Sequence, residues 1–204
     1  MSTTPHTYLS ELYLMYFIVP LWILAGVADW ICHRRAAIER TSGPKESMLH
    51  LLMLAEMGIP VLAGLFLEVN ALIFGLMITA FFFHEATALW DVTFASKWRR
   101  ITPVEQHIHS FLEMLPLMAI SIMALIHWGQ FAALFGGGSE LPDFTLRFKT
   151  TPLPSHYVLL LMAAIAVFEL MPYAQELWRT WHCRMQRGKP RDELGSSGHS
   201  AHRQ

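Results

Sequence analysis

Long apolar segments separated by short polar stretches make up most of the chain. Each segment is long enough to cross the ~30 Å hydrocarbon core of a bilayer. The longest apolar run is broken only at Glu68–Asn70, which predicts two helices joined there by a tight turn. A glycine- and proline-rich stretch over residues 136–154 predicts an irregular loop. The predicted transmembrane helices cover about 8–28, 48–67, 71–90, 105–128 and 156–178.

The pattern therefore predicts an all-α, polytopic membrane bundle. We expect one domain over residues 1–186, followed by a disordered cytoplasmic tail over 187–204, where apolar residues are scarce. Lysine and arginine gather in the connections after the first and third segments and after the fifth. The positive-inside rule then predicts an outer N-terminus, a cytoplasmic C-terminus and a multi-pass location in the inner (plasma) membrane.

The composition agrees with the lipid bilayer as the surrounding solvent. Of 204 residues, 53% are hydrophobic and 15% are charged, which is too apolar for an ordinary soluble domain. The net charge is −1, so the chain offers no broad basic field, and we expect no nucleic-acid partner.

Two of the polar connections end in the same short pattern, P-x-E-x-x-x-H. It runs from Pro44 to His50 and again from Pro103 to His109. Proline suits the first turn of a helix, and residues four apart share a helix face. Each helix therefore enters the membrane with a carboxylate and an imidazole on one side, as one half of a two-fold metal site would.

Further ionisable residues are predicted at the same depth, near the cytoplasmic ends of the first four helices. Charged groups inside a membrane segment cost a few kcal/mol and usually carry function. We expect the arginines to stay in the connections, so two metal ions are the positive charge that best fits these acids. The predicted ligands are Asp29, His33, Glu46, His50, His84, Asp91, Glu105 and His109. The groups expected to orient them are Glu56, Glu85, His107, Glu113 and Glu169.

Structural roles compete with ligation at several positions. Glu105 follows Thr102 by three residues, which is the pattern of a capping box. A carboxylate in a first turn, such as Glu46, is also favoured by the helix dipole. His33 and His107 lie where an interfacial histidine with access to water would lie. At these four positions the sequence leaves both roles open.

The layout resembles the integral-membrane di-iron oxygenases of the fatty acid hydroxylase and desaturase superfamily. In that group histidine-rich motifs sit at the cytoplasmic ends of transmembrane helices. The resemblance covers roughly residues 25–115, without the HxxHH boxes of the hydroxylases, and is carried by Asp29-x3-His33, Glu46-x3-His50 and Glu105-x-His107-x-His109. The ligand chemistry is also similar to that of ferritin-like di-iron bundles, where glutamate and histidine are three residues apart rather than four.

Together these features predict a dinuclear metal oxidoreductase of the oxygenase type, acting on a hydrophobic substrate near the cytoplasmic leaflet. Two iron ions are favoured over manganese or zinc, with electrons from a separate donor. The alternatives are a divalent-metal transporter or sensor, a b-type cytochrome and a single-zinc hydrolase. A transporter needs polar residues through to the outer side, and the near absence of such residues beyond Glu68, Asn70 and His127 counts against it. The substrate, the donor and the oligomeric state are left open.

Overall fold

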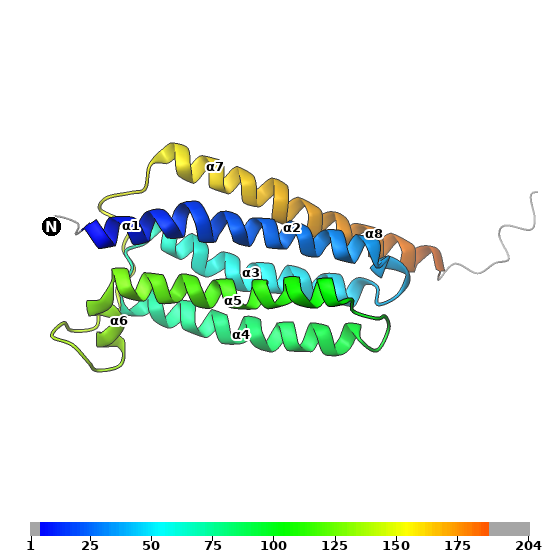
Figure 1. Cartoon of the computed structure of the whole chain (residues 1–204), viewed down its shortest axis with the longest axis horizontal. Helices are drawn as coiled ribbons and strands as arrows, with labels where there is room; N and C mark the ends of the chain where they lie inside the picture. Colours follow the sequence, from blue (N-terminus) through cyan, green and yellow to red (C-terminus); the bar gives the residue numbers. More distant parts are fainter. Residues whose placement is uncertain (1–4, 188–204) are drawn as a thin grey trace, which may run out of the picture.

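The computed structural model describes residues 5–187 as a bundle of long helices lying side by side (Figure 1). Two of these long helices are each interrupted by one π-helical turn, and two short helices lie in the connections. The elements are α1 (Pro5–Tyr13), η1 (Leu14–Ile18), α2 (Val19–Arg35), η2 (Ile38–Arg40), α3 (Pro44–Phe66), α4 (Ala71–Ala95), α5 (Pro103–Ile126), α6 (Trp128–Leu134), α7 (Ser155–Ile165), η3 (Ala166–Leu170) and α8 (Met171–Arg187).

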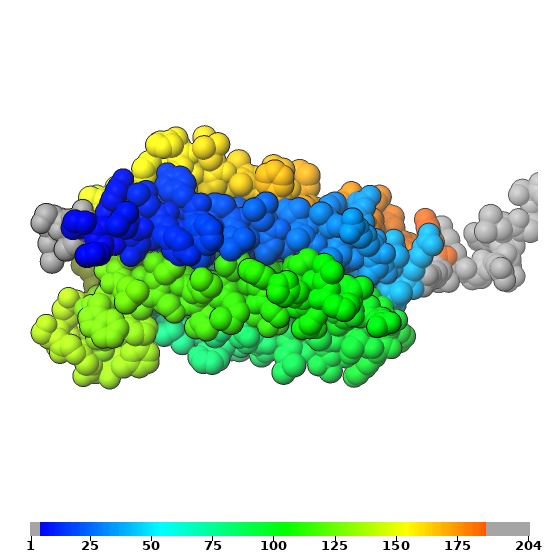
Figure 2. Space-filling view, in the orientation of Figure 1, coloured from blue at the N-terminus to red at the C-terminus, as the bar shows by residue number. Residues whose placement is uncertain are grey.

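Five continuous helical segments are long and apolar enough to cross a membrane, which confirms the predicted helical class and the five spans. Large apolar side chains cover the outside of the bundle: Leu89 is 70% exposed and Leu125 is 72% exposed. A multi-pass membrane protein needs such a surface, because lipid is as apolar as these side chains. Figure 2 shows α1, α2 and α5 covering one face of an elongated molecule.

The first and last spans extend beyond their predicted limits, because the apolar pattern marks where lipid contact ends and not where the helix ends. α2 continues to Arg35 and α8 to Arg187 through polar last turns. The short α6 was not predicted as a separate helix. The first residue of the predicted tail, Arg187, is instead the last residue of α8. The rest of the predicted tail, residues 188–204, lies outside the described residues.

The predicted helix starts are confirmed at both copies of the repeated pattern. Pro44 opens α3 after Gly43, whose φ of 74° is readily adopted only by glycine. Pro103 opens α5 after Thr102, and Thr102 and Glu105 form a reciprocal capping box. Both first-turn glutamates are thereby fixed on the inner side of the bundle, where they are fully buried.

Apolar and polar cores occupy opposite ends of the bundle. Residues 36–43 and 96–102 form the connections at one end, which we call the basic end; the irregular residues 136–154, which we call the strap, lie at the other (Figure 1). Near the strap end, Phe74 and Ile73 are almost completely buried in an apolar cluster. The buried acids and histidines lie toward the basic end. α3 packs against both α4 and α8, and α2 packs against α5.

The strap is held across the turn between α3 and α4. Glu68 accepts hydrogen bonds from the backbone N–H of Thr150 at 2.7 Å and from its hydroxyl at 2.9 Å. Asn70 donates to the carbonyl oxygen of Thr145 at 2.8 Å and caps α4 by accepting from Ile73 N–H. The Thr150 backbone N–H is the main cause of a lowered pKa at Glu68.

Candidate metal centre

Histidines and carboxylates from four spans meet in the interior near the basic end. Asp29 and His33 come from the last turns of α2, and His109 comes from the second turn of α5. His50 lies in α3 and Asp91 near the end of α4. All five side chains are at least nine-tenths buried, so the predicted gathering of these ligands is present.

The first group of candidate donor atoms consists of Asp29 Oδ1 and the Nε2 atoms of His33 and His109. Asp29 Oδ1 lies 2.9 Å from His109 Nε2 and 3.4 Å from His33 Nε2. First-row metal bonds of about 2.0–2.2 Å set neighbouring ligand atoms roughly 3.0–3.4 Å apart. These three residues therefore have the spacing of ligands that share one ion, and they form one of two candidate metal-binding groups in the described chain.

The second group centres on His50. Its Nε2 lies 3.4 Å from Asp91 Oδ2. The rings of His33 and His50 are stacked, with centroids 4.1 Å apart and an interplanar angle of 5°. Paired metals in proteins lie about 3.5–4 Å apart. Two parallel imidazoles at this separation can each direct a nitrogen toward one ion of a pair. Glu46 belongs to the second candidate group, with His33 and His50.

Glu176 on α8 fixes the orientation of the His50 ring and lies beside the His33 ring. Its Oε1 lies 2.7 Å from Nδ1 of His50, and its Oε2 lies 3.4 Å from Nδ1 of His33. A carboxylate on one ring nitrogen sets the tautomer and leaves the other nitrogen for a metal. The predicted site did not include Glu176, although it lies seven residues after Glu169, two helical turns along the same face.

Tyr173 and Glu169 complete the α8 side of the centre. The Tyr173 hydroxyl lies 3.3 Å from Asp29 Oδ2 and 3.2 Å from the carbonyl oxygen of Gly26. Glu169 lies in the π-helical turn η3 and is 2% exposed. A Cβ at Gly26 would overlap its carboxylate, so a larger residue there would force this buried side chain to shift. π-helical turns are frequent at functional sites.

Arg99 reaches into the bundle from the connection between α4 and α5. Its guanidinium binds Glu46 Oε1 at 2.5 Å and Glu105 Oε1 at 2.6 Å, and the arginine side chain is only 4% exposed. The expectation that the arginines stay in the connections was therefore wrong for the side chain of Arg99. An arginine anchored in a connection is long enough to carry its charge inward, and its fork suits two carboxylates.

Both first-turn glutamates consequently have a structural partner. Glu105 combines three contacts: the capping box, the Arg99 ion pair and a distance of 3.6 Å from Oε1 to His33 Nε2. Glu46 is held by Arg99 on the other side. Arg99 therefore balances about one of these two charges, and it ties the starts of α3 and α5 together beneath the histidines.

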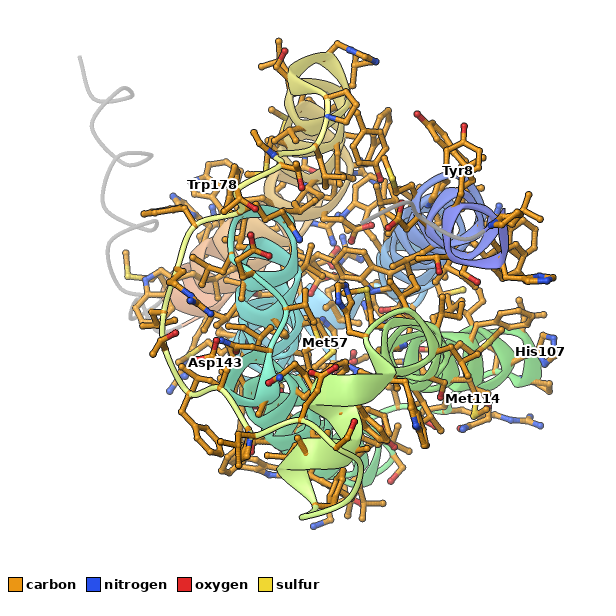
Figure 3. The ribbon with its side chains drawn as sticks, turned by 90° about the vertical axis from the view of Figure 1, so that its left-hand side faces the viewer. Tyr8, Met57, His107, Met114, Asp143 and Trp178 are labelled. Atoms are coloured by element: carbon orange, nitrogen blue, oxygen red, sulfur yellow. The ribbon has the colours of Figure 1, made fainter. Side chains whose placement is uncertain are left out.

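The remaining predicted residues differ in how close they come to the centre. His84 is buried but faces Glu56, with Nδ1 4.0 Å from Oε2, and Glu56 accepts from the Thr87 hydroxyl at 2.8 Å. Glu85 is only partly buried. His107 is exposed, contacts Phe111 and points away from the bundle (Figure 3), so the structure does not support a ligand-orienting role for it.

A cavity of about 60 Å³ lies against the two donor groups. Ligand candidates from four helices line it together with Glu113, Glu169 and Tyr173. Several buried atoms have no hydrogen-bond partner within residues 5–187, which is costly unless another group satisfies them. They include Asp29 Oδ1, both ring nitrogens of His33, His50 Nε2, Asp91 Oδ1 and Glu169 Oε1.

The donor chemistry fits metal ions. Asp29, Asp91, Glu169 and Glu176 are four buried acids beyond the two that Arg99 pairs. Imidazole and carboxylate together suit iron, manganese or zinc. The buried histidine, aspartate and glutamate groups can therefore bind metal ions, with Nε2 of three histidines and two aspartates as the central donors.

No family model, curated protein or solved structure matches the chain. The chemistry of this centre therefore carries the functional interpretation.

Proposed function

We propose that the protein is a membrane-embedded dinuclear metal oxidoreductase, with iron as the metal, that acts on a hydrophobic substrate dissolved in the membrane. The observation that carries the proposal is the convergence of three imidazoles and two aspartates with unpaired buried atoms, beside a small cavity that Asp29, His50, Asp91 and His109 line. Five central donors shared by two ions leave coordination positions open, as non-haem iron oxygenases require.

The residues of the chain have separate roles in this proposal. A bound di-iron pair would supply the redox chemistry that activates dioxygen toward a C–H bond. Glu176 keeps Nε2 of His50 directed at the centre through its hydrogen bond with Nδ1, and its other oxygen lies beside Nδ1 of His33. The Tyr173 hydroxyl orients Asp29 from the opposite side. The surrounding apolar bundle excludes water, and a separate donor protein supplies the electrons.

We also propose that the basic end faces the cytoplasm and that the protein lies in the inner membrane. Arg34, Arg35, Lys97 and Arg100 lie at the basic end, whereas the strap contributes Arg147 and Lys149. Excess positive charge in short connections marks the cytoplasmic side. The metal centre then opens toward the cytoplasmic leaflet, where a soluble electron donor has access.

The lining beyond the centre favours an enzyme over an ion transporter. From Trp22 and Met57 toward the strap end, a second cavity is lined almost wholly by apolar side chains until Glu11, His127 and Lys149. A hydrated ion finds no continuous polar path along that route, whereas a hydrophobic molecule does.

The reaction is tested by dioxygen consumption. Iron-loaded protein in lipid nanodiscs is chemically reduced without oxygen, mixed with dioxygen and followed with an oxygen electrode and by absorbance. We expect rapid uptake that His109→Ala abolishes and that His107→Ala leaves unchanged, because only His109 contacts the centre. Full iron content without oxygen uptake would reject the oxidoreductase, and a single tightly held zinc would favour a hydrolase.

A further inference from the structure

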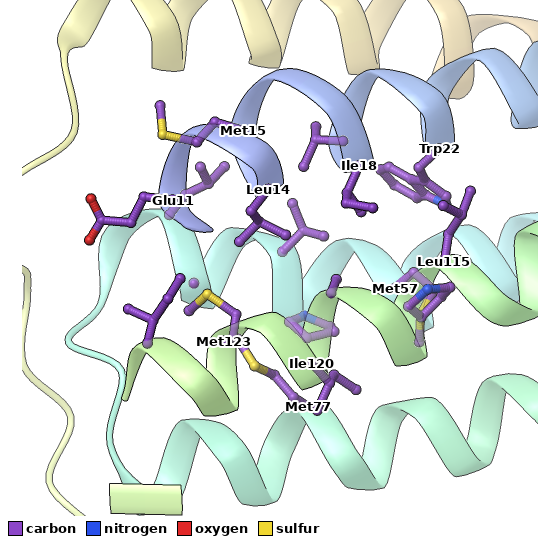
Figure 4. A pocket seen from close by; sticks show the side chains of 18 of the residues that line it. Glu11, Leu14, Met15, Ile18, Trp22, Met57, Met77, Leu115, Ile120 and Met123 are labelled. Atoms are coloured by element: carbon purple, nitrogen blue, oxygen red, sulfur yellow. The ribbon is translucent and has the colours of Figure 1, made fainter. Parts of the chain in front are cut away.

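A long apolar cavity of about 210 Å³ lies in the strap-side half of the bundle. Its walls come from α1, η1 and α2 on one side and from α3, α4 and α5 on the other (Figure 4). An engineered protein cavity of about 150 Å³ stays dry and binds benzene. The cavity therefore holds a slim hydrocarbon segment and is too small for both tails of a membrane lipid.

The inner end of this cavity adjoins the metal centre. Trp22 and Met57 line both this cavity and the smaller one that holds the ligands. Figure 3 shows Met57 in the middle of the bundle, and Figure 4 shows it beside Trp22 at the end of the cavity far from Glu11. A flexible methionine is a suitable separator, because it can change rotamer without a large penalty.

The outer end carries the polar groups of the lining. Glu11 comes from α1, His127 from the end of α5 and Lys149 from the strap. Burial lowers the pKa of Lys149, while the nearby carboxylates of Glu68 and Glu11 act in the opposite direction. Lys149 and Glu11 thus offer one donor and one acceptor whose charges balance. Such a pair has no net charge to compensate the desolvation of an ionised head group, whereas an uncharged hydroxyl can donate to Glu11 and accept from Lys149.

We infer that this cavity binds a single-chain amphiphile with an uncharged, hydrogen-bonding head, such as a long-chain alcohol. The head lies between Glu11 and Lys149, and the chain end lies against Trp22 and Met57. The inference rests on the proposed function in one respect: the chain end is the part of the substrate that the metal centre oxidises.

Fluorescence quenching in nanodiscs tests the binding directly, since alkyl detergents would compete for the cavity. The probe is a long-chain alcohol with two bromine atoms near its chain end, because bromine quenches tryptophan on contact. The chain has seven tryptophans, so Trp22 must be isolated by difference. We expect saturable quenching that Trp22→Phe removes and that Trp128→Phe, at a 61% exposed position, retains.

Two further comparisons test the shape of the cavity and its preference for an uncharged head group. Ala119→Phe fills the cavity and is expected to abolish saturable quenching, whereas Leu125→Phe on the lipid-facing side of α5 leaves it intact. Probes of the same chain with a carboxylate or a trimethylammonium head are expected to bind at least tenfold more weakly than the alcohol. Equal binding of all three heads, or quenching that persists in Ala119→Phe, would overturn the inference.

The metal-site variant separates the two proposals. His109→Ala removes a ligand outside the large cavity, so it is expected to lose metal and oxygen uptake while the bromoalcohol still quenches Trp22. Wild-type protein that holds iron but shows no saturable quenching refutes the cavity inference alone. Wild-type protein that shows quenching but holds no metal refutes the proposed function and leaves the cavity as a binding site.

Discussion

At the residue scale, the candidate metal ligands and the glutamates beside them are held in position by neighbouring polar side chains. Glu176 contacts both stacked imidazoles, Tyr173 contacts Asp29, and Arg99 joins two first-turn glutamates. Buried ionised groups are tolerated when they are paired, and removal of one partner leaves the other uncompensated. Substitutions at these contacts therefore have larger effects than substitutions of the same type nearby.

Arg99→Ala should destabilise the protein strongly. It removes the cation between Glu46 and Glu105, and loss of one partner from a buried ion pair costs about 3–5 kcal/mol. Arg100→Ala is the matched control, because Arg100 is exposed and surface substitutions change stability by about 0.5 kcal/mol or less. Thermal unfolding followed by circular dichroism compares the two. Equal stability of both variants would show that the Arg99 ion pairs are not formed.

Gly26→Ala tests the contact between α2 and η3. The new methyl group would overlap the Glu169 carboxylate, and overpacking of this kind costs about 1–3 kcal/mol. We expect lower stability and a reduced metal content, since Asp29 lies one turn further along α2. Gly58→Ala is the control, because a Cβ there meets no atom within 4 Å. A Gly26→Ala protein as stable and as metal-loaded as the control would contradict the packing described.

At the element scale, the helices were more predictable than the contacts between them. Apolar runs and the proline and threonine start signals located all five spans, because lipid imposes its thickness on each segment. The π-helical turn η3 has no comparable sequence signal. His107 and His109 are about 200° apart around one helix. The sequence therefore shows that they face different sides but not which side is the interior.

The partners of the predicted ligands were also hidden from sequence. Arg99 belongs to a basic connection, and only the direction of its side chain reveals that it enters the bundle. Glu176 shares a helix face with Glu169, but its polar neighbours in α8, such as Gln175, are typical of a solvent-facing segment. The candidate ligands could be recognised in the sequence because histidines and acids are rare in apolar runs, whereas their pairing depends on helix packing.

The strap provides a prediction for the effect of pH. The lowered pKa of Glu68 means that its ionised form stabilises the folded state. This contribution is complete above the unfolded-state pKa of about 4.3 and is lost as the pH falls through the lower folded-state pKa. Because the carboxylate is largely solvated, Glu68→Gln should cost at most about 1 kcal/mol at pH 7.

The measurement is the difference in unfolding midpoint between wild type and Glu68→Gln as a function of pH. The difference should shrink toward zero in acid, where wild-type Glu68 is protonated like the amide. A difference that grows as the pH is lowered would contradict the hydrogen bonds from Thr150.

At the scale of the whole molecule, one end of the bundle holds the candidate metal ligands and the other holds an apolar cavity bordered by the strap. The ligands lie toward the basic end, and the large cavity extends toward the strap. If the basic end is cytoplasmic, a membrane-dissolved substrate and a soluble electron donor approach the centre from different directions. The orientation of the chain therefore affects the mechanism as well as the topology.

The orientation can be measured with a membrane-impermeant maleimide on intact cells. Ser139→Cys, in a chain whose Cys32 and Cys183 are replaced by serine, introduces an exposed thiol at the start of the strap. We expect labelling without permeabilisation. A matched Ser96→Cys thiol at the basic end should react only after permeabilisation. The reverse pattern would invert the proposed topology.

The most direct measurement of the dinuclear centre is the number of metal ions per chain, determined by mass spectrometry of purified wild type and two variants. We expect about two irons per wild-type chain, loss of metal from His109→Ala without loss of the helical fold, and unchanged metal in His107→Ala. Wild-type protein without tightly held metal, or His109→Ala that retains both ions, would contradict the dinuclear centre.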